Sequence, residues 1–328
     1  MVKQSRRREV IKRGGGALVA AGFIAGCSGR GEDATLASGS GNGSPGGVTV
    51  GSKNFAESKI LGYMAYERLN RNTDLALTDQ MGYGPTSEAW SGLTGSDLGM
   101  YWEYSGTMLL THPPQSQETY GTVEESYSNA KEMVESNHDL TVLNNAPFNN
   151  SYGMLTTQSW AETTGVETLS DLAAHINGRN TDARIAIGPS FADRLDGWSG
   201  LLDYYGFENS AVSEWEDSIF TIQLGLTYAR LNNDDVDIAM GFTTDPQIQA
   251  NNLVLLEDDQ SFWPIYSPAP VVANSVIDNN PVVQPQLDAI GPAIGDRETM
   301  QKLNGRVDID GENPQQVATD FLSNEGLI

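Results

Sequence analysis

The chain alternates between short β-branched segments and longer segments with apolar residues at helical spacing. Val48–Gly51 is short and β-branched, which predicts a strand. Asn54 follows as a predicted helix cap. The next apolar residues share one helical face: Ile60, Leu61, Met64, Ala65 and Leu69. The first ordered unit is therefore predicted to be a strand, a loop and a helix.

The same alternation recurs further along the chain. It predicts a helix capped by Ser170 and running to Ile176, a buried strand over Arg184–Gly188, a helix over Trp198–Tyr205 and a strand over Val236–Met240. Strands that alternate with helices favour an α/β fold with mostly parallel sheets.

The N-terminal segment is predicted to be an export signal and not part of the fold. Arg6–Lys12 has paired arginines, a spacer, two apolar residues and a lysine, which resembles a twin-arginine signal. The apolar stretch that follows is too short to span a bilayer, and it ends in Ile24–Cys27, which resembles a lipobox. Residues 1–26 are thus expected to be removed, which leaves Cys27 lipidated on the outer face of the membrane. The alternative is that Cys27, the single cysteine, is a buried thiol behind an uncleaved anchor helix.

Residues 27–47 are rich in glycine and serine and contain few apolar side chains. Such a composition cannot bury enough surface to fold, so this segment is predicted to be a flexible tether. The ordered part then begins near Val48 and has about 280 residues, enough for two domains of ordinary size.

Acidic residues dominate the charge balance. The sequence contains 19 Lys and Arg against 43 Asp and Glu. Removal of residues 1–26 takes away six basic residues and one acid, which leaves 13 basic and 42 acidic residues and a formal charge of −29. This charge argues against nucleic acid or an anionic membrane surface as a partner. At molar salt the Debye length is about 3 Å and the repulsion is screened, so we infer a halophilic, archaeal source. An acidic secreted protein of ordinary habitat is the alternative.

The motifs that an enzyme would need are missing from the sequence. The three histidines, His112, His138 and His175, lack metal-ligand spacing and are interpreted as surface or loop residues. No nucleophile elbow, phosphate-binding loop or zinc-protease motif occurs. We therefore expect no catalysis, no metal and no cofactor.

Aromatic residues occur near the ends of several predicted strands. They are Tyr104, Tyr152, Phe242 and Tyr266. In open α/β sheets, ligands gather beyond the carboxyl ends of strands, so these four rings could converge. Core packing is the alternative for any one of them taken singly.

The surroundings of these rings resemble a known family. The matching blocks are Val48–Glu57, Tyr104–Thr107, Asn150–Tyr152, Phe191–Gly197, Asp237–Asp245 and Pro264–Pro268. In the same order, similar blocks occur in the substrate-binding proteins that deliver glycine betaine, choline and related quaternary amines to ABC transporters. The blocks that contain Lys53 and Arg194 are the most distinctive.

The resemblance implies a two-lobed, type II periplasmic-binding-protein-like fold with two hinge crossings and a ligand cleft between the lobes. Residues 48–149 and 247–328 would form lobe 1, and residues 150–246 would form lobe 2. The protein is expected to be a monomer that works with a membrane permease and its ATPase.

The resemblance also assigns the ligand-binding residues. The aromatic cage would consist of Tyr104, Tyr152, Phe242 and Tyr266, and the ligand carboxylate would be held by Lys53, Thr107 and Arg194. Phe242 stands where a tyrosine is usual in the family, so that ring keeps its π face but not the hydroxyl. Tyr101 and Trp102, which precede the cage block, are interpreted as packing residues.

Two other classes of function stay open. One is a choline or carnitine carrier, or a receptor subunit that senses osmolytes without transporting them. The paired cations Lys53 and Arg194 favour a carboxylated ligand over choline. The other is an extracellular enzyme on the same scaffold, with Glu103 or Asp193 as the acid–base group. A structural ion pair or a solvated acidic face is the alternative interpretation of those two acids.

Overall fold

The computed structural model of the chain describes residues 47–116, 120–192, 196–222 and 226–328, and all structural statements concern these residues. The predicted export signal, Cys27 and the tether up to residue 46 lie outside the described residues, as does Arg194. No described helix combines the length and the apolar character needed to cross a membrane.

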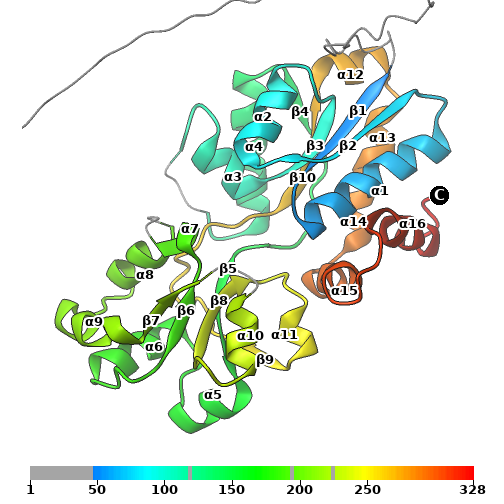
Figure 1. Ribbon diagram of the computed structural model, residues 1–328. Helices are drawn as coiled ribbons and strands as arrows, with labels where there is room; N and C mark the ends of the chain where they lie inside the picture. The colour runs from blue at the N-terminus through cyan, green and yellow to red at the C-terminus, as the bar shows by residue number, and fades with distance from the viewer. Residues whose placement is uncertain (1–46, 117–119, 193–195, 223–225) are drawn as a thin grey trace, which may run out of the picture. The chain divides into compact units, whose positions relative to one another are not determined.

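One of the two sheets formed by the described residues has the strand order β2-β1-β3-β10-β4 (Figure 1). Its strands are β1 (Val48–Lys53), β2 (Leu77–Gly84), β3 (Met100–Tyr104), β4 (Leu140–Val142) and β10 (Pro268–Ala273). Strand β1 pairs in parallel with β2 and β3, whereas β10 pairs antiparallel with β3 and β4. The C-terminal part of the chain therefore completes a sheet that the N-terminal part begins.

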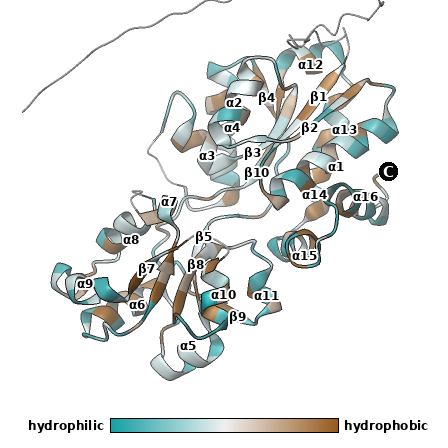
Figure 2. Ribbon diagram, viewed as in Figure 1, coloured by the Kyte–Doolittle hydropathy of each residue, from teal (hydrophilic) through white to brown (hydrophobic). Residues whose placement is uncertain are grey.

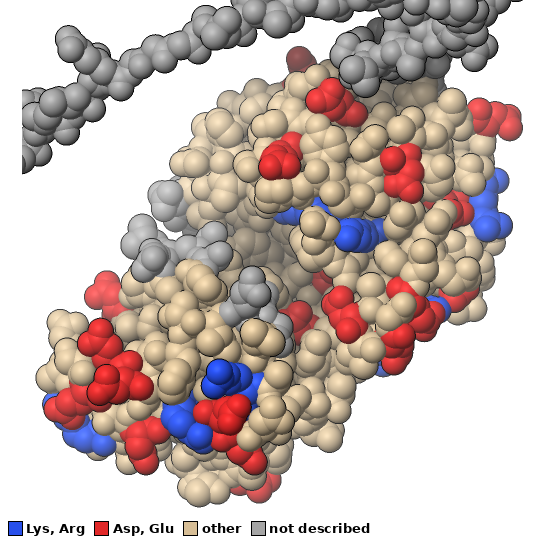
Figure 3. Space-filling view, viewed as in Figure 1, with Lys and Arg blue, Asp and Glu red and all other residues tan. Residues whose placement is uncertain are grey.

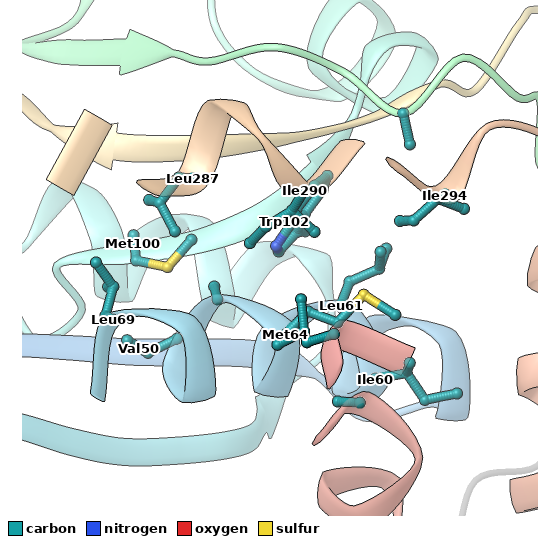
Figure 4. Close-up of a cluster of buried hydrophobic side chains, with 14 of the residues drawn as sticks. Val50, Ile60, Leu61, Met64, Leu69, Met100, Trp102, Leu287, Ile290 and Ile294 are labelled. Carbon is teal, nitrogen blue, oxygen red and sulfur yellow. The ribbon is translucent and has the colours of Figure 1, made fainter. Parts of the chain in front are cut away.

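Helix α1 (Ala56–Asn72) packs its apolar face into the core beside this sheet. Figure 4 shows the packed side chains, which are Ile60, Leu61, Met64 and Leu69 of the helix with Val50, Met100, Trp102, Leu287, Ile290 and Ile294. The helix residues recur at intervals of three and four, which places them on one face. Trp102 and Tyr101 are fully buried, which confirms that they are packing residues.

The other helices of this part of the chain lie between its strands or after β10. They are α2 (Thr86–Thr94), α3 (Ser105–Thr111), α4 (Val123–Asn137), α12 (Asn274–Asn279), α13 (Val283–Asp288), α14 (Ile290–Ile294), α15 (Arg297–Asp308) and α16 (Pro314–Asn324).

The second sheet has the strand order β7-β6-β8-β5-β9. Its strands are β5 (Tyr152–Thr157), β6 (Ile185–Ile187), β7 (Ile219–Thr221), β8 (Ile238–Phe242) and β9 (Leu253–Leu255). Strand β6 is parallel to β7 and β8, and β5 is antiparallel to β8 and β9. Strands β6 and β8 are strongly apolar, as Figure 2 shows, because helices or loops cover both of their faces.

Short helices connect the strands of the second sheet. They are α5 (Gln158–Thr164), α6 (Leu169–Asn177), α7 (Pro189–Ala192), α8 (Trp198–Tyr204), α9 (Asn209–Trp215), the 3-10 helix η1 (Glu216–Ser218), α10 (Leu226–Asn232) and α11 (Gln247–Ala250).

The predicted elements exist, but both predicted helix caps are wrong. Helix α1 begins at Ala56, with Phe55 at the N-cap and no capping bond from its side chain. Helix α6 is capped by Thr168 and not by Ser170. The Thr168 hydroxyl accepts from the Asp171 backbone, and the Asp171 carboxylate accepts from the Thr168 backbone. This reciprocal capping box requires an acid three residues after the cap, and Thr168 meets that condition.

The prediction of mostly parallel sheets holds for strand direction. In each sheet four of the five strands run the same way, and β10 or β5 runs in the opposite direction. One domain boundary needs correction: the predicted return to lobe 1 at residue 247 is too early, since β9 at residues 253–255 still pairs with β5. The chain rejoins the first sheet at Pro268, where β10 begins. Strand β9 has only three residues, too few to give a recognisable alternation in the sequence.

The antiparallel strands determine where the predicted cage residues lie. Strand β8 ends at Phe242, and β5 begins at Tyr152, its cross-strand partner. Strand β3 ends at Tyr104, which pairs with Pro268 at the start of β10. At one edge of each sheet, the last residue of one strand therefore lies beside the first residue of the neighbouring antiparallel strand.

Candidate ligand-binding pocket

A pocket of about 770 Å³ lies at these strand edges. Six aromatic side chains line it, namely Phe55, Tyr104, Tyr152, Tyr228, Phe242 and Tyr266. The four rings predicted from the sequence are all among them. The sequence reasoning did not assign Phe55 and Tyr228 to the site, although Phe55 lies in the block that contains Lys53.

Three of the rings form a concave aromatic corner. The ring centroids of Tyr152 and Phe242 are 5.2 Å apart with an interplanar angle of 28°, as expected for a directly paired position on adjacent strands. The Tyr266 ring stands nearly perpendicular to Tyr152, at 79° and 6.3 Å. The Tyr266 hydroxyl is 3.1 Å from the Asp196 carboxylate, to which it donates. The stacked pair and the third ring at right angles to Tyr152 give the pocket an aromatic wall against which a rounded apolar group can pack.

Tyr104 lines the pocket from the end of β3. Its hydroxyl donates to Glu57 Oε1 over 2.8 Å, and the Phe55 ring lies 6.1 Å from its own ring. Burial and the charge of Glu57 raise the pKa of Tyr104 well above its usual value, so the hydroxyl keeps its proton and acts as a donor. Tyr104 therefore combines a ring at the pocket with a fixed link to a buried carboxylate.

Lys53 lines the pocket, and its charge is already paired. Its ammonium group forms an ion pair with Glu103, which is fully buried, and lies 5.0 Å from the centroid of the Tyr104 ring. Glu103 also accepts hydrogen bonds from the Tyr101 hydroxyl at 2.8 Å and from the Tyr104 backbone at 2.8 Å. Burial would raise the pKa of Glu103, but the Lys53 charge and the bond from His112 lower it to about 2. Glu103 is thus a member of a structural ion pair.

His112, which is predicted to be a surface or loop residue, lies in a loop but not on the surface. The side chain is buried, its ring stacks on Trp90 with centroids 3.8 Å apart, and Nε2 donates to Glu103 Oε2 over 3.2 Å. It follows directly after α3, and the buried carboxylate of Glu103 accounts for its position inside the protein.

Acidic side chains that the sequence reasoning did not assign to the site line another part of the pocket. They are Glu57, Asp245 and Asp308. Burial raises the pKa of all three, and it raises that of Asp245 to about 6. Asp245 accepts from the Tyr228 hydroxyl and from the Phe242 backbone, the latter at 2.8 Å. Within the matching block, the position of Glu57 four residues after Lys53 was the only signal available from the sequence.

The remaining predicted residues are Thr107 and Arg194. Thr107 lines the pocket from the first turn of α3. Arg194 lies outside the described residues. The described residues contain no group of three or more His, Cys, Asp or Glu side chains able to hold a metal ion.

Comparison with known proteins gives consistent matches over most of the chain. Residues 46–324 match a protein-family model described as the substrate-binding domain of the ABC-type glycine betaine transport system. The chain is 33% identical over 286 residues to the chemotactic signal transduction system substrate-binding protein CosB of Halobacterium salinarum, covering 86% of this chain and 84% of CosB. It is 30% identical over 288 residues to a glycine-betaine-binding protein of Pseudomonas aeruginosa, covering 86% of this chain and 88% of that protein.

A solved structure shares the fold. The crystal structure of a glycine betaine/carnitine/choline ABC transporter matches with a TM-score of 0.73 and 26% identity, over 85% of this chain and 99% of that chain. The match spans both sheets and confirms the predicted two-lobed α/β binding-protein fold.

Proposed function

Because this chain belongs to the family of substrate-binding domains of ABC-type glycine betaine transport systems, we propose that it captures a betaine osmolyte in the pocket. The observation that carries this proposal is the aromatic corner of Tyr152, Phe242 and Tyr266 beside Tyr104. A trimethylammonium group has no N–H to donate and carries a diffuse charge. Each well-placed ring can replace its water and contributes about 0.5–2 kcal/mol.

The carboxylate of a betaine needs cationic or hydroxyl donors, for which we propose Lys53, Thr107 and Arg194. Lys53 already neutralises Glu103, so a ligand carboxylate has to share its ammonium group. Arg194 then supplies the second positive charge and can hold both carboxylate oxygens. A ligand bound in this way is released unchanged, since the role is capture and delivery and not catalysis.

The cellular setting belongs to the same proposal. The protein is exported by the twin-arginine route, anchored by a lipid on Cys27 and held at the outer face of the membrane as a monomer. It delivers its ligand to a permease and an ATPase, in a halophilic cell. The protein has two forms, and the permease recognises one of them. Ligand binding shifts the equilibrium toward that form because the ligand binds it more tightly than the other.

A second candidate function is sensing without transport. It is favoured by the 33% identity to CosB, whose name describes a chemotactic signal transduction system. In this case the ligand and the pocket are unchanged, and a membrane signal transducer takes the place of the permease. Copurification of the lipid-anchored protein with a permease or with a transducer distinguishes the two.

Titration calorimetry at molar salt tests the capture of a quaternary amine. Glycine betaine, proline betaine, choline and carnitine are the ligands, and binding of at least one is expected. Tyr104→Ala, Tyr152→Ala and Tyr266→Ala should each weaken binding at least about tenfold, because a ring that contacts the cation is lost. Phe242→Tyr should change the affinity little, since it keeps the π face.

Tyr204→Ala is the matched control, because this tyrosine is 52% exposed and does not line the pocket. Its affinity should equal that of the unaltered protein. Folded alanine variants of the three pocket tyrosines that bind normally would show that the cage is wrongly placed. Failure of all four ligands would remove the proposed function.

A further inference from the structure

Glu57 is a buried carboxylate in the pocket wall whose hydrogen-bond donors, among the residues that the structure describes, are all neutral. The side chain belongs to the first turn of α1, and the residue is 2% exposed. Its Oε1 accepts from the Tyr104 hydroxyl and from Asn150 Nδ2, both at 2.8 Å, and its Oε2 accepts from Asn304 Nδ2 at 3.1 Å. Neutral donors hold the carboxylate in place but do not cancel its charge.

The Thr244 side chain is a further neutral hydrogen-bond partner of Glu57. The two asparagines that donate to Glu57 leave buried acceptors in the same wall. A carboxylate only accepts hydrogen bonds, so Asn150 and Asn304 must turn their amide nitrogens toward Glu57. Their Oδ1 atoms are buried and accept no hydrogen bond from any residue that the structure describes. Asn304 is 4% exposed and, like Asn150, lines the pocket. This part of the pocket thus contains an anion and two unused acceptors.

Within the described parts of the chain, the charged side chains of the pocket do not compensate Glu57. Lys53, whose ammonium group lies 5.0 Å from the centroid of the Tyr104 ring, is paired with Glu103. Asp245 lies close enough that the charge of Glu57 contributes to raising its pKa. Asp308 is a third acid of the same pocket, and its charge is partly offset by Lys59. A buried charge without an opposite charge is costly, and a bound cation would remove that cost.

We propose that Glu57 is the counter-charge for the ligand's ammonium group, and that it makes this pocket distinguish a cation from a neutral molecule of the same shape. The inference rests on the proposed function, and it adds the residue that reads the charge. The rings surround the methyl groups, so their contribution to the affinity depends on the apolar shape of the ligand as well as on its charge. Glu57 contributes only when the ligand is positively charged.

The substitution Glu57→Gln removes the charge and preserves the shape. The introduced glutamine can still accept from Tyr104 and Asn150 through its oxygen. Its new amide group faces the Asn304 amide. An amide flip turns Asn304 Oδ1 toward the glutamine as an acceptor, but it gives up the hydrogen bond that Asn304 Nδ2 donates to the Thr244 carbonyl at 3.1 Å. Thermal unfolding followed by circular dichroism verifies that the variant folds.

The test uses ligand pairs that differ only in charge. Choline is compared with 3,3-dimethylbutan-1-ol, and glycine betaine with 3,3-dimethylbutanoate, in which a carbon replaces the quaternary nitrogen. For each pair, the affinity for the quaternary amine divided by that for its carbon isostere is measured by calorimetric competition at molar salt. In Glu57→Gln this ratio should fall at least about tenfold, which corresponds to about 1.4 kcal/mol.

Two further variants sharpen the result. Glu132→Gln, an exposed acid on α4, should leave the ratio unchanged. Asp245→Asn tests whether Asp245, another buried acid of the pocket, is the counter-charge in place of Glu57. The proposal is overturned if Glu57→Gln weakens both members of a pair equally, which is the result expected of a structural residue. It is also overturned if the ratio falls in Asp245→Asn and not in Glu57→Gln. If none of glycine betaine, proline betaine, choline and carnitine binds the unaltered protein, the proposed function itself fails.

Discussion

At the scale of single residues, the buried ion pair of Lys53 and Glu103 neutralises a positive charge in the wall of the pocket. An ammonium group next to an aromatic pocket would repel a cationic ligand if its charge were free. Glu103 neutralises that charge. The Glu103 carboxylate is bound by Lys53, Tyr101, His112 and the Tyr104 backbone. The four partners leave Glu103 fully satisfied although it is completely buried.

We expect Glu103→Gln to lower the free energy of unfolding by about 3–5 kcal/mol, because it leaves Lys53 as a buried charge without a partner. Glu132→Gln on the exposed face of α4 should change it by less than about 0.5 kcal/mol. Denaturant unfolding at constant high salt measures both. Equal stabilities of the two variants would contradict a structural role for the ion pair.

The same residue predicts a dependence on pH. The pKa of Glu103 is about 2 in the folded protein, below its ordinary value of 4.5. The stability that it contributes is therefore complete above pH 4.5 and is lost as the pH falls toward 2. Over that range the unaltered protein should lose stability more steeply than Glu103→Gln. Parallel curves for the two proteins would mean that another carboxylate dominates acid unfolding.

At the scale of elements, the antiparallel pairing of β5 with β8 builds the aromatic corner. Tyr152 and Phe242 are cross-strand partners, and the next pair inward is Gly153 with Gly241. A side chain at Gly241 would overlap the Tyr228 hydroxyl, and its Cβ would lie 2.9 Å from Leu155 Cδ1. Glycine is needed here because α10 packs its tyrosine directly on the strand.

Two glycine-to-alanine substitutions should thus have opposite effects. Gly241→Ala should destabilise the protein by about 1–3 kcal/mol, since Tyr228 must move. Gly305→Ala, inside α15, meets only Pro246 Cβ at 3.4 Å and should stabilise by about 0.5–1 kcal/mol through its helix propensity. Denaturant unfolding of both variants gives the signs. Destabilisation by Gly305→Ala, or none by Gly241→Ala, would show that the local packing differs from that described.

At the scale of the whole molecule, acidic side chains outnumber basic ones by 43 to 19. Figure 3 shows many separate Asp and Glu side chains and few Lys and Arg on the face drawn. The sequence carries a formal net charge of −24, and −29 without residues 1–26. Such a surface repels itself unless salt screens it.

The melting temperature should therefore fall as the salt concentration is lowered from about 3 M to about 0.1 M, over which the Debye length grows to about 10 Å. Differential scanning calorimetry of the mature chain measures the change. Potassium chloride and sodium chloride should act alike, because screening depends on ionic strength. An unchanged melting temperature over this range would contradict adaptation to high salt.

The family, the two-lobed fold and the identity of four pocket rings could be predicted from the sequence. Strand and helix positions follow from patterns within a few residues of each other, and the matching blocks are short and continuous. Tyr104, Tyr152, Phe242 and Tyr266 each lie in or beside such a block, so local information was enough to select them.

The pairing of charges and the polar wall of the pocket were decided only by the tertiary structure. Glu103 lies 50 positions from Lys53, and Asn304 lies 247 positions from Glu57. The location of β9 in the second sheet also depends on a partner strand distant in the chain. Whether a charge is neutralised depends on which groups folding brings within a few ångströms of that charge. It also depends on how much water folding excludes from around the charge. Neither quantity is encoded in the residues next to that charge along the chain.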